Sequence, residues 1–271
     1  MLNTEEIFFL KQKSAQIRKT IIEMLYQAGS GHPGGSLSLV EILVYLYFKE
    51  IKINIEKPQS TERNTLILSK GHGCPALYTV LAEIGLFNKD VLKTYKKLNS
   101  ILQGHPDRLK TPGIDMSTGS LGQGLSVGIG CALADKIKGD NHKTYVILGD
   151  GELQEGQIWE AAIFASRNDL DNLCVFIDNN KLQLTSKVEE IFGKRNLSLI
   201  WKDFGWESIE IDGHDFDEID SAVLYPTKKP KIVIANTIKG KGISFMENKI
   251  EWHSKKISED DYKKALNELL I

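Results

Sequence analysis

The stretch TYVILGDGELQEGQIWEAAIFASRNDLDNLCVFIDNNKLQ, residues 144–183, decides the fold of this 271-residue chain. It begins with a short apolar run rich in β-forming residues, continues with an amphipathic helical pattern, and ends in a second apolar run. A strand, a helix and a strand of these lengths predict a parallel βαβ unit with a right-handed crossover. Both strands then point the same way, so Asp150 and Asn180 each follow the carboxyl end of a strand. We expect them to meet at the edge where open α/β sheets bind ligands.

Asp150 and Asn180 offer the oxygen ligands that a hard divalent cation prefers. A carboxylate, an amide oxygen and a backbone carbonyl from one of the two residues after Asn180 form a set that suits Mg²⁺ or Ca²⁺. Mg²⁺ usually completes its octahedron with phosphate oxygens and water. Gly149 and Gly151 flank the aspartate and let the backbone approach a bulky anion closely.

Other interpretations of these glycines fit less well. The spacing in residues 151–156 resembles half a P-loop, but residues 157–158 are Gln-Ile where Lys-Ser or Lys-Thr is required. A dinucleotide-binding fingerprint fails because the GIG at residues 128–130 is followed by Leu133 instead of glycine. A plain turn after a strand would explain GDG alone, but it leaves DNN at the matching second strand end unexplained.

Length and composition narrow the class of protein. A chain of 271 residues suits one large α/β domain or two small ones. The net charge of −2 gives no indication of nucleic acid or an anionic membrane as a partner. Three cysteines without metal-ligand spacing predict reduced thiols and a cytoplasmic setting. The first residues carry early acids and few apolar positions, so we expect no signal peptide, and no run has transmembrane length.

The rest of the chain predicts one α/β domain over residues 1–271, with a mainly parallel sheet of at least five strands and helices on both faces. We expect an N-terminal helix at 3–29, a core at 30–240, and a C-terminal loop and helix at 241–271, with capping patterns at Asn3 and Ser258. Within the core we expect strands at 63–69, 144–148, 173–177, 206–211 and 231–237, helices at 37–47, 75–84, 121–134, 197–204 and 215–225, and a helix plus loop within 86–110.

The helix expected at residues 121–134 repeats small residues at fourfold spacing. Glycine in a helix costs about 1 kcal/mol relative to alanine, so several together predict another backbone packed closely on this helix. Packing inside the domain and packing in a subunit interface explain the pattern equally well.

The six histidines fall into two groups. His32, His72, His105 and His253 lie in Gly/Pro loops or after a strand end, whereas His142 and His214 lie in polar turns without special context. Imidazole can accept and donate protons near neutrality, so several histidines around one pocket would suit proton transfer to and from sugar hydroxyls. A zinc site is the rival interpretation, but no cysteine accompanies these histidines and their spacing fits no zinc motif.

Six motifs, in this order, resemble the transketolase family: SGHPGG (30–35), SKGHG (69–73), GHPD (104–107), STGSLGQG (117–124), GDGELQEG (149–156) and DNNKLQL (178–184). The resemblance covers residues from about 10 to 260. It implies a thiamine-diphosphate-binding domain of the type that holds the diphosphate, with thiamine diphosphate and Mg²⁺ as cofactors and Ca²⁺ or Mn²⁺ as possible substitutes. The sequence around His253, KGKGISFMENKIEWHSK, is similar to split or deoxyxylulose-phosphate-synthase-type versions.

Site residues carried over from this resemblance form three groups. The metal ligands implied are Asp150, Asn180 and the carbonyl of Leu182. Cofactor contacts are implied for His72, Gly119, Leu121, Gly149, Asp150, Gly151, Glu152, Asn180, Leu184, Ile238 and His253. The residues implied in catalysis are His32, His72, His105, His253 and Glu155, of which Glu155 corresponds to the family's buried acid that links the two active sites of a dimer.

The family's reaction needs a glutamate on the cofactor's aminopyrimidine, and in the family that glutamate lies on a second domain that these residues do not match. We therefore expect the chain to be the N-terminal subunit of a split transketolase, active only in an α₂β₂ assembly with a separate C-terminal subunit. It would transfer a two-carbon glycolaldehyde unit between small-molecule sugar phosphates.

Three alternatives stay open. The first is a subunit of another thiamine diphosphate enzyme, such as a deoxyxylulose-phosphate-synthase relative or an oxoacid dehydrogenase α-chain. The second is a transketolase-like enzyme for an unusual sugar phosphate. The third is a non-catalytic paralogue.

Overall fold

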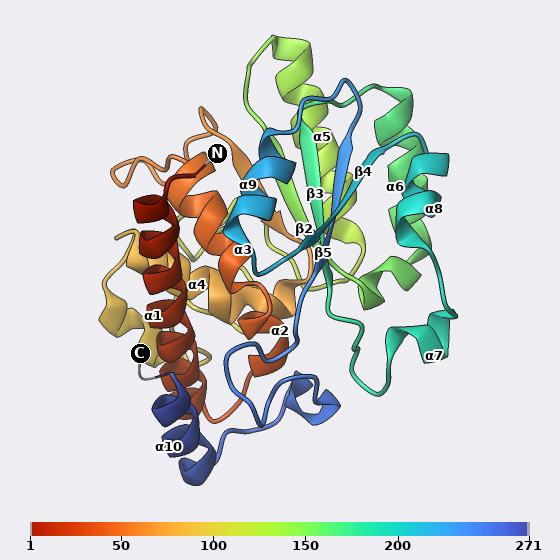
Figure 1. The fold of residues 1–271 in the computed structure, drawn as a ribbon. Coiled ribbons are helices and arrows are strands. Elements are labelled where there is room, and N and C mark those ends of the chain that lie inside the picture. Colours follow the sequence, from red (N-terminus) through yellow and green to blue (C-terminus); the bar gives the residue numbers. More distant parts are fainter. Residues whose placement is uncertain (1, 270–271) are drawn as a thin grey trace.

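Five strands form one parallel sheet in the computed structural model of the chain, which describes residues 2–269 (Figure 1). The order across the sheet is β1-β2-β3-β5-β4, and every neighbouring pair is parallel. The strands are β1 Thr65–Leu68, β2 Thr144–Gly149, β3 Leu173–Asn179, β4 Glu207–Asp212 and β5 Lys231–Asn236. The predicted α/β fold and the predicted βαβ unit are therefore confirmed.

Alternate residues of the strands enter two separate hydrophobic cores, one on each face of the sheet. Tyr145 and Ile147 of β2 belong to the first core, whereas Val146 and Leu148 belong to the second. The helices of the first face are α1 Thr4–Ala28, α2 Pro33–Leu37, α3 Val40–Tyr45, α4 Cys74–Glu83 and α9 Phe216–Leu224; those of the second are α5 Gln123–Lys138, α6 Gly156–Arg167 and α8 Leu197–Asp203 (Figure 1). β1, β2, β3 and β5 are buried on both faces and read as continuous apolar runs, which is how the sequence located them.

Both predicted terminal helices are present and carry the predicted caps. Asn3 and Glu6 form a capping box at the start of α1, and Ser258 and Asp261 form one at the start of α10, Glu259–Glu268. These helices lie side by side in the fold, and α10 was predicted to continue to Ile271 (Figure 1). Residues 1 and 270–271 lie outside the described residues.

The single helix predicted at residues 37–47 is wrong. The structure divides this stretch into α2, α3 and a π-helical turn, η1 Leu46–Glu50, with a break at Ser38 and Leu39. The Ser38 hydroxyl donates a 2.7 Å hydrogen bond to the buried carboxylate of Asp178, 140 residues away. The break is thus tied to a long-range contact that helical periodicity does not register.

The helix and the loop predicted within residues 86–110 are both present, but the helix is short. This segment contains one short 3₁₀ helix, η3 Lys89–Thr94, followed by turns. Lys96 and Asn99 have φ angles of 60° and 64°, in the left-handed region that a continuous helix excludes.

Four short elements at or near the carboxyl edge of the sheet complete the fold: η2 Gly71–Gly73, η4 Gly151–Gln154, α7 Val188–Phe192 and η5 Ile250–His253. Three of them carry the motifs singled out from the sequence, since η2 contains His72, η4 contains Glu152 and η5 contains His253. Within residues 2–269, no helix combines the length and apolarity that crossing a bilayer would need.

Candidate active site

Asp150 and Asn180 lie at the same edge of the sheet, just past the ends of β2 and β3. Gly149 pairs with Asp178 in the register of these strands, and the Asp150 amide donates a 3.4 Å hydrogen bond to the Asp178 carbonyl. Asp150 is 4% exposed and Asn180 is 6% exposed. The structure thus brings together the two side chains that the strand topology predicted to meet.

The Asp150 carboxylate is buried, and within residues 2–269 no cationic side chain is hydrogen-bonded to it. Its oxygens accept hydrogen bonds from the backbone amides of Gly151, at 2.7 Å, and of Lys181. Burial, with the nearby charge of Asp178, raises the pKa of Asp150 to about 7. A divalent cation would offset both effects, so the chemistry of this carboxylate fits a metal ligand.

Asn180 and Leu182 supply the other two oxygens of the predicted metal set. The Asn180 side-chain nitrogen donates a 3.1 Å hydrogen bond to the Asp178 carboxylate. The Asn180 side-chain oxygen accepts a 3.1 Å hydrogen bond from the Leu182 amide. The Leu182 carbonyl accepts a 3.0 Å hydrogen bond from the Lys239 ammonium. One of the expected metal ligands, the Leu182 carbonyl, is thus already hydrogen-bonded to a cationic side chain.

Asp178 is the most buried charged group of the edge, with none of its surface exposed. Its carboxylate accepts hydrogen bonds from Lys70 at 2.5 Å, from Ser38 and from Thr237. Burial alone would raise the pKa of Asp178, but the Lys70 charge and these hydrogen bonds outweigh it and hold the pKa below its ordinary value. Lys70 and Asp178 were not predicted, because nothing local in sequence marks the pairing of residues 108 positions apart.

Four histidines gather beside this edge, as the sorting of the sequence predicted. The ring centroids of His32, His72 and His253 lie 5.2 to 5.4 Å apart, and His105 lies 6.5 Å from His32. Burial and the positive charges of nearby lysines lower the pKa of His32 to about 4 and that of His253 to about 3, and they lower the pKa of His72 and His105 as well. These rings are therefore neutral at physiological pH, so each has one unprotonated nitrogen.

Among the described residues, these four histidines do not form a group of metal ligands that would support the rival zinc interpretation. Within residues 2–269, the one group of three metal-ligating side chains with its ligand atoms within 4.8 Å of one another is Asp135, Asp140 and His142. It precedes β2, at the opposite end of that strand from Asp150.

Glu152 holds three loops together. Its carboxylate is 2% exposed and accepts hydrogen bonds from the Ser69 hydroxyl at 2.5 Å and from the amides of Gly122 and Gly149 at 2.8 and 3.0 Å. These partners belong to three of the motifs found in the sequence. Both carboxylate oxygens of Glu152 are therefore used within the protein, where they join these three loops.

The remaining predicted site residues lie nearer the surface. Gly119 packs on His105, since an added Cβ would lie 3.1 Å from the ring, and Leu121 and Ile238 are half-buried. Leu184 is 59% exposed and Glu155 is exposed too, although the resemblance implied a buried acid at Glu155. Burial of Glu155 would need a further surface over this part of the chain.

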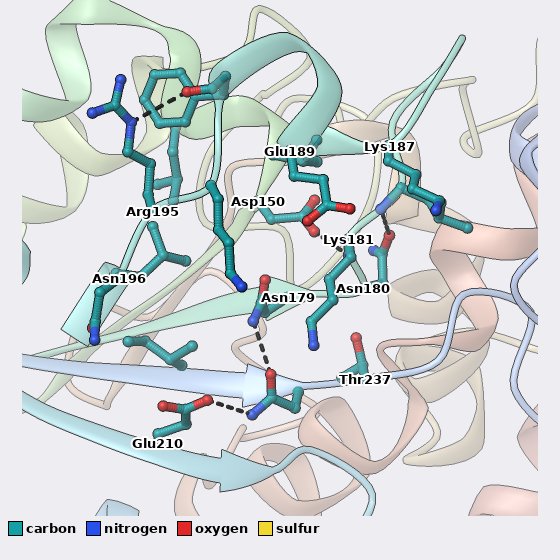
Figure 2. A pocket seen from close by; sticks show the side chains of 18 of the residues that line it. Asp150, Asn179, Asn180, Lys181, Lys187, Glu189, Arg195, Asn196, Glu210 and Thr237 are labelled. Atoms are coloured by element: carbon teal, nitrogen blue, oxygen red, sulfur yellow. Dashed lines mark hydrogen bonds between the residues drawn. The ribbon is translucent and has the colours of Figure 1, made fainter.

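A cavity of about 890 Å³ opens between the ends of β3 and β5 and the segment 181–198. Figure 2 shows Asp150, Asn180 and Thr237 on one side of this space, with Glu189 and Arg195 from the following segment around it. Four basic residues line it: Lys181, Lys187, Lys194 and Arg195. Their charges suit an anionic ligand.

The comparison with known families decides the identity of this edge. The family described as "Transketolase, thiamine diphosphate binding domain" matches residues 10–269. The chain belongs to the transketolase family. The resemblance drawn from the six motifs is thereby confirmed, and the carboxyl edge that holds Asp150 and Asn180 is part of a thiamine-diphosphate-binding domain.

Relatives in the transketolase family are similar over almost the whole chain. The chain is 45% identical to the "6-deoxy-6-sulfo-D-fructose transketolase subunit SqwG" of Clostridium sp. (strain MSTE9), covering 98% of both chains. It is 40% identical to an apulose-4-phosphate transketolase subunit of Phocaeicola vulgatus, over 96% of this chain and 93% of that one.

Longer transketolases match over less than half of their own length. Human transketolase is 36% identical over 96% of this chain, but the match covers 42% of the human protein. The crystal structure of transketolase from Campylobacter jejuni superposes with a TM-score of 0.90 at 32% identity, covering 99% of this chain and 43% of that one. The chain therefore corresponds to the N-terminal, thiamine-diphosphate-binding part of the family.

Proposed function

We propose that this chain is the thiamine-diphosphate-binding subunit of a two-chain transketolase, which transfers a glycolaldehyde unit from a ketose phosphate to an aldose phosphate. The observation that supports this most directly is the oxygen set of buried Asp150, buried Asn180 and half-buried Leu182 beside four neutral histidines. When bound, thiamine diphosphate supplies an electron sink for the two-carbon unit.

Residues of this chain would hold the cofactor at its charged end. Asp150, Asn180 and the Leu182 carbonyl would bind Mg²⁺, and His72, Gly151 and His253 would contact the diphosphate. A metal on the Leu182 carbonyl would be repelled by the Lys239 ammonium that contacts the same oxygen. Burial, together with the charge of Lys70, lowers the pKa of Lys239 to about 8, so this amine gives up its charge more easily than an ordinary lysine.

The histidines would move protons on the substrate. His32, His105 and His253 would face the donor sugar, and a neutral imidazole near a hydroxyl can accept its proton. The Nδ1 atom of His32 is buried and has no hydrogen-bond partner among the described residues, which leaves it available to a ligand.

The exposed residues support a second chain. Glu155 and Leu184 are expected to contact the cofactor or the neighbouring site, yet both are exposed here. A C-terminal subunit that carries the pyrimidine-binding domain would cover them, and an α₂β₂ assembly would complete two sites. The three cysteines are unpaired, in keeping with a cytoplasmic enzyme.

A second candidate concerns the substrate. Two of the most similar relatives bear names that specify 6-deoxy-6-sulfo-D-fructose and apulose-4-phosphate. Transfer from such an unusual anionic sugar would use the same cofactor site, and the basic residues of the cavity suit an anion of either kind.

Activity of the reconstituted complex tests the function. The chain would be co-expressed with the product of the adjacent reading frame, and the complex would be assayed with thiamine diphosphate and Mg²⁺ against xylulose phosphate, sulfofructose, apulose phosphate and pyruvate. We expect two-carbon transfer from one of the sugars, and none from the chain alone. Activity of the isolated chain would contradict the two-chain proposal, and turnover of pyruvate alone would contradict the transketolase assignment.

A further inference from the structure

His214, which the sequence placed in an ordinary polar turn, is bound on both of its ring nitrogens. It follows β4, and its side chain is 10% exposed. Nδ1 lies 2.8 Å from a carboxylate oxygen of Glu41, and Nε2 accepts a 2.9 Å hydrogen bond from the Ile238 amide.

These two contacts fix the protonation of the ring. Nε2 accepts a hydrogen bond from an amide, so it carries no proton, and the proton of the neutral ring is on Nδ1. Glu41 is an acceptor, because the charge of Arg18 outweighs the effect of burial and holds the pKa of Glu41 at about 2. His214 therefore donates to Glu41 and accepts from Ile238.

Arg18 extends the network to the N-terminal helix. Its two terminal nitrogens donate to the Glu41 carboxylate at 2.6 and 2.7 Å, and its Nε donates to the Lys241 carbonyl at 3.0 Å. Arg18 and Glu41 are 7% and 6% exposed. The buried network is thus hydrogen-bonded to both ends of the segment 238–241, at the Ile238 amide and at the Lys241 carbonyl.

The segment between these two hydrogen bonds contacts residues of the candidate active site. The Lys239 ammonium contacts the Leu182 carbonyl and His253 Nδ1, each at 3.0 Å. The Gly240 amide donates a 3.0 Å hydrogen bond to the carbonyl of Gly34, in the SGHPGG motif. A displacement of this segment would therefore move Lys239 and Ile238 relative to the metal ligands and the histidines.

We propose that Arg18, Glu41 and His214 are positioning residues that fix the segment 238–241, and that His214 does so as the neutral Nδ1–H tautomer. The consequence for cofactor binding rests on the function proposed above, but the tautomer and the anchoring of Ile238 do not. A merely structural ion pair would need Arg18 and Glu41 alone. The positioning role needs the acceptor atom of His214 as well.

The tautomer can be observed in the unmodified chain. Long-range ¹H–¹⁵N correlation spectra of full-length protein labelled at histidine should show His214 protonated at Nδ1 and bare at Nε2 near pH 7.5. An Nε2–H tautomer would overturn the proposal directly, whether or not the chain binds thiamine diphosphate.

Two matched variants separate the acceptor from the donor of His214. In His214→Gln the side-chain oxygen can take the place of Nε2 and accept from Ile238, whereas in His214→Asn the amide nitrogen can take the place of Nδ1 and donate to Glu41 alone. We expect the Ile238 amide to stay protected from hydrogen exchange in His214→Gln and to exchange at least about tenfold faster in His214→Asn, since a lost buried hydrogen bond has about this effect.

Cofactor dependence in the reconstituted complex supplies the functional readout. His214→Asn should raise the thiamine diphosphate concentration for half-maximal rate about tenfold relative to His214→Gln, with kcat at saturation within about twofold. Equal Ile238 exchange in the two variants would overturn the proposal. A wild-type complex whose rate does not depend on thiamine diphosphate would instead contradict the proposed function. The tautomer of His214 and the hydrogen exchange of Ile238 would then still test whether the segment 238–241 is anchored as proposed.

Discussion

Two regions of this chain differ in how far their side chains are buried and hydrogen-bonded within the chain. The inner edge, comprising Lys70, Asp150, Asp178 and Asn180, is at most 6% exposed, and hydrogen bonds are made by each of its members. The outer rim is exposed to solvent to differing degrees, and its Ile163 is 57% exposed. It comprises Leu121, Glu155, Gln157 and the apolar residues Ile163 and Phe164 of α6. The inner edge is therefore complete within the chain, whereas the rim exposes apolar side chains, as a surface covered by another chain would.

The largest expected effect comes from breaking the inner edge at Lys70. Lys70→Met would leave the Asp178 carboxylate buried without its cation, and removing one partner of a buried pair costs about 3–5 kcal/mol. Urea unfolding of the isolated chain measures this loss. The exposed pair Lys93–Asp90 is the matched control, since Lys93→Met should leave the unfolding midpoint unchanged. Equal midpoints for both variants would show that the inner edge is no more tightly built than the surface.

Removing the charge of Asp150 should separate stability from cofactor binding. Asp150→Asn deletes a desolvated carboxylate, so the isolated chain should unfold at an equal or higher temperature. Binding of thiamine diphosphate with Mg²⁺ by the reconstituted complex should weaken by more than about a hundredfold, because loss of a metal ligand exceeds the 10- to 100-fold cost of changing a residue that only orients one. Titration calorimetry measures the affinity, with Asp140→Asn, an exposed acid at the other end of β2, as the control. Wild-type affinity in Asp150→Asn would remove Asp150 from the metal site.

The raised pKa of Asp150 gives a smaller effect with a defined sign. In the unfolded chain this carboxyl ionises near 3.8, and in the folded chain it ionises at about 7, so between these values the folded state holds more protons. Stability contributed by protonated Asp150 is therefore lost as pH rises from about 4 to about 7 without metal. Thermal melts of wild type and Asp150→Asn across this range should diverge, with the steeper fall in wild type. Asp178 acts in the opposite direction, because its pKa is lowered and its contribution is lost as pH falls below about 4. Parallel melting curves for the two proteins would contradict the pKa assigned to Asp150.

The smallest effect on the chain itself is expected at the outer rim. Glu155→Gln changes an exposed side chain, so the free energy of unfolding of the isolated chain should shift by no more than about 0.5 kcal/mol. In the reconstituted complex the same change should lower activity or weaken assembly, measured by steady-state rates and sedimentation. An unchanged complex would mean that the rim at Glu155 is ordinary surface.

Local sequence patterns predicted the strands, the caps and the meeting of Asp150 with Asn180, because each depends on residues close in the chain or on the direction of parallel strands. They also placed His32, His72, His105 and His253 together through their motifs. The undivided helix at 37–47 was wrong, and the roles of Lys70, Asp178 and Lys239 were missed. Each of these features depends on a partner 57 to 140 positions away in the chain. Ser38 is hydrogen-bonded to Asp178, for example, and Lys239 to Leu182.

The amino-acid sequence by itself determined that this protein is a parallel α/β domain with an oxygen-rich, histidine-rich edge, since apolar periodicity and strand ends are local properties. Only the tertiary structure decided which buried charges pair with one another and which histidine anchors the segment 238–241. Such pairing depends on which groups lose water together, and that is fixed by the packing of distant segments and not by their neighbours in the chain.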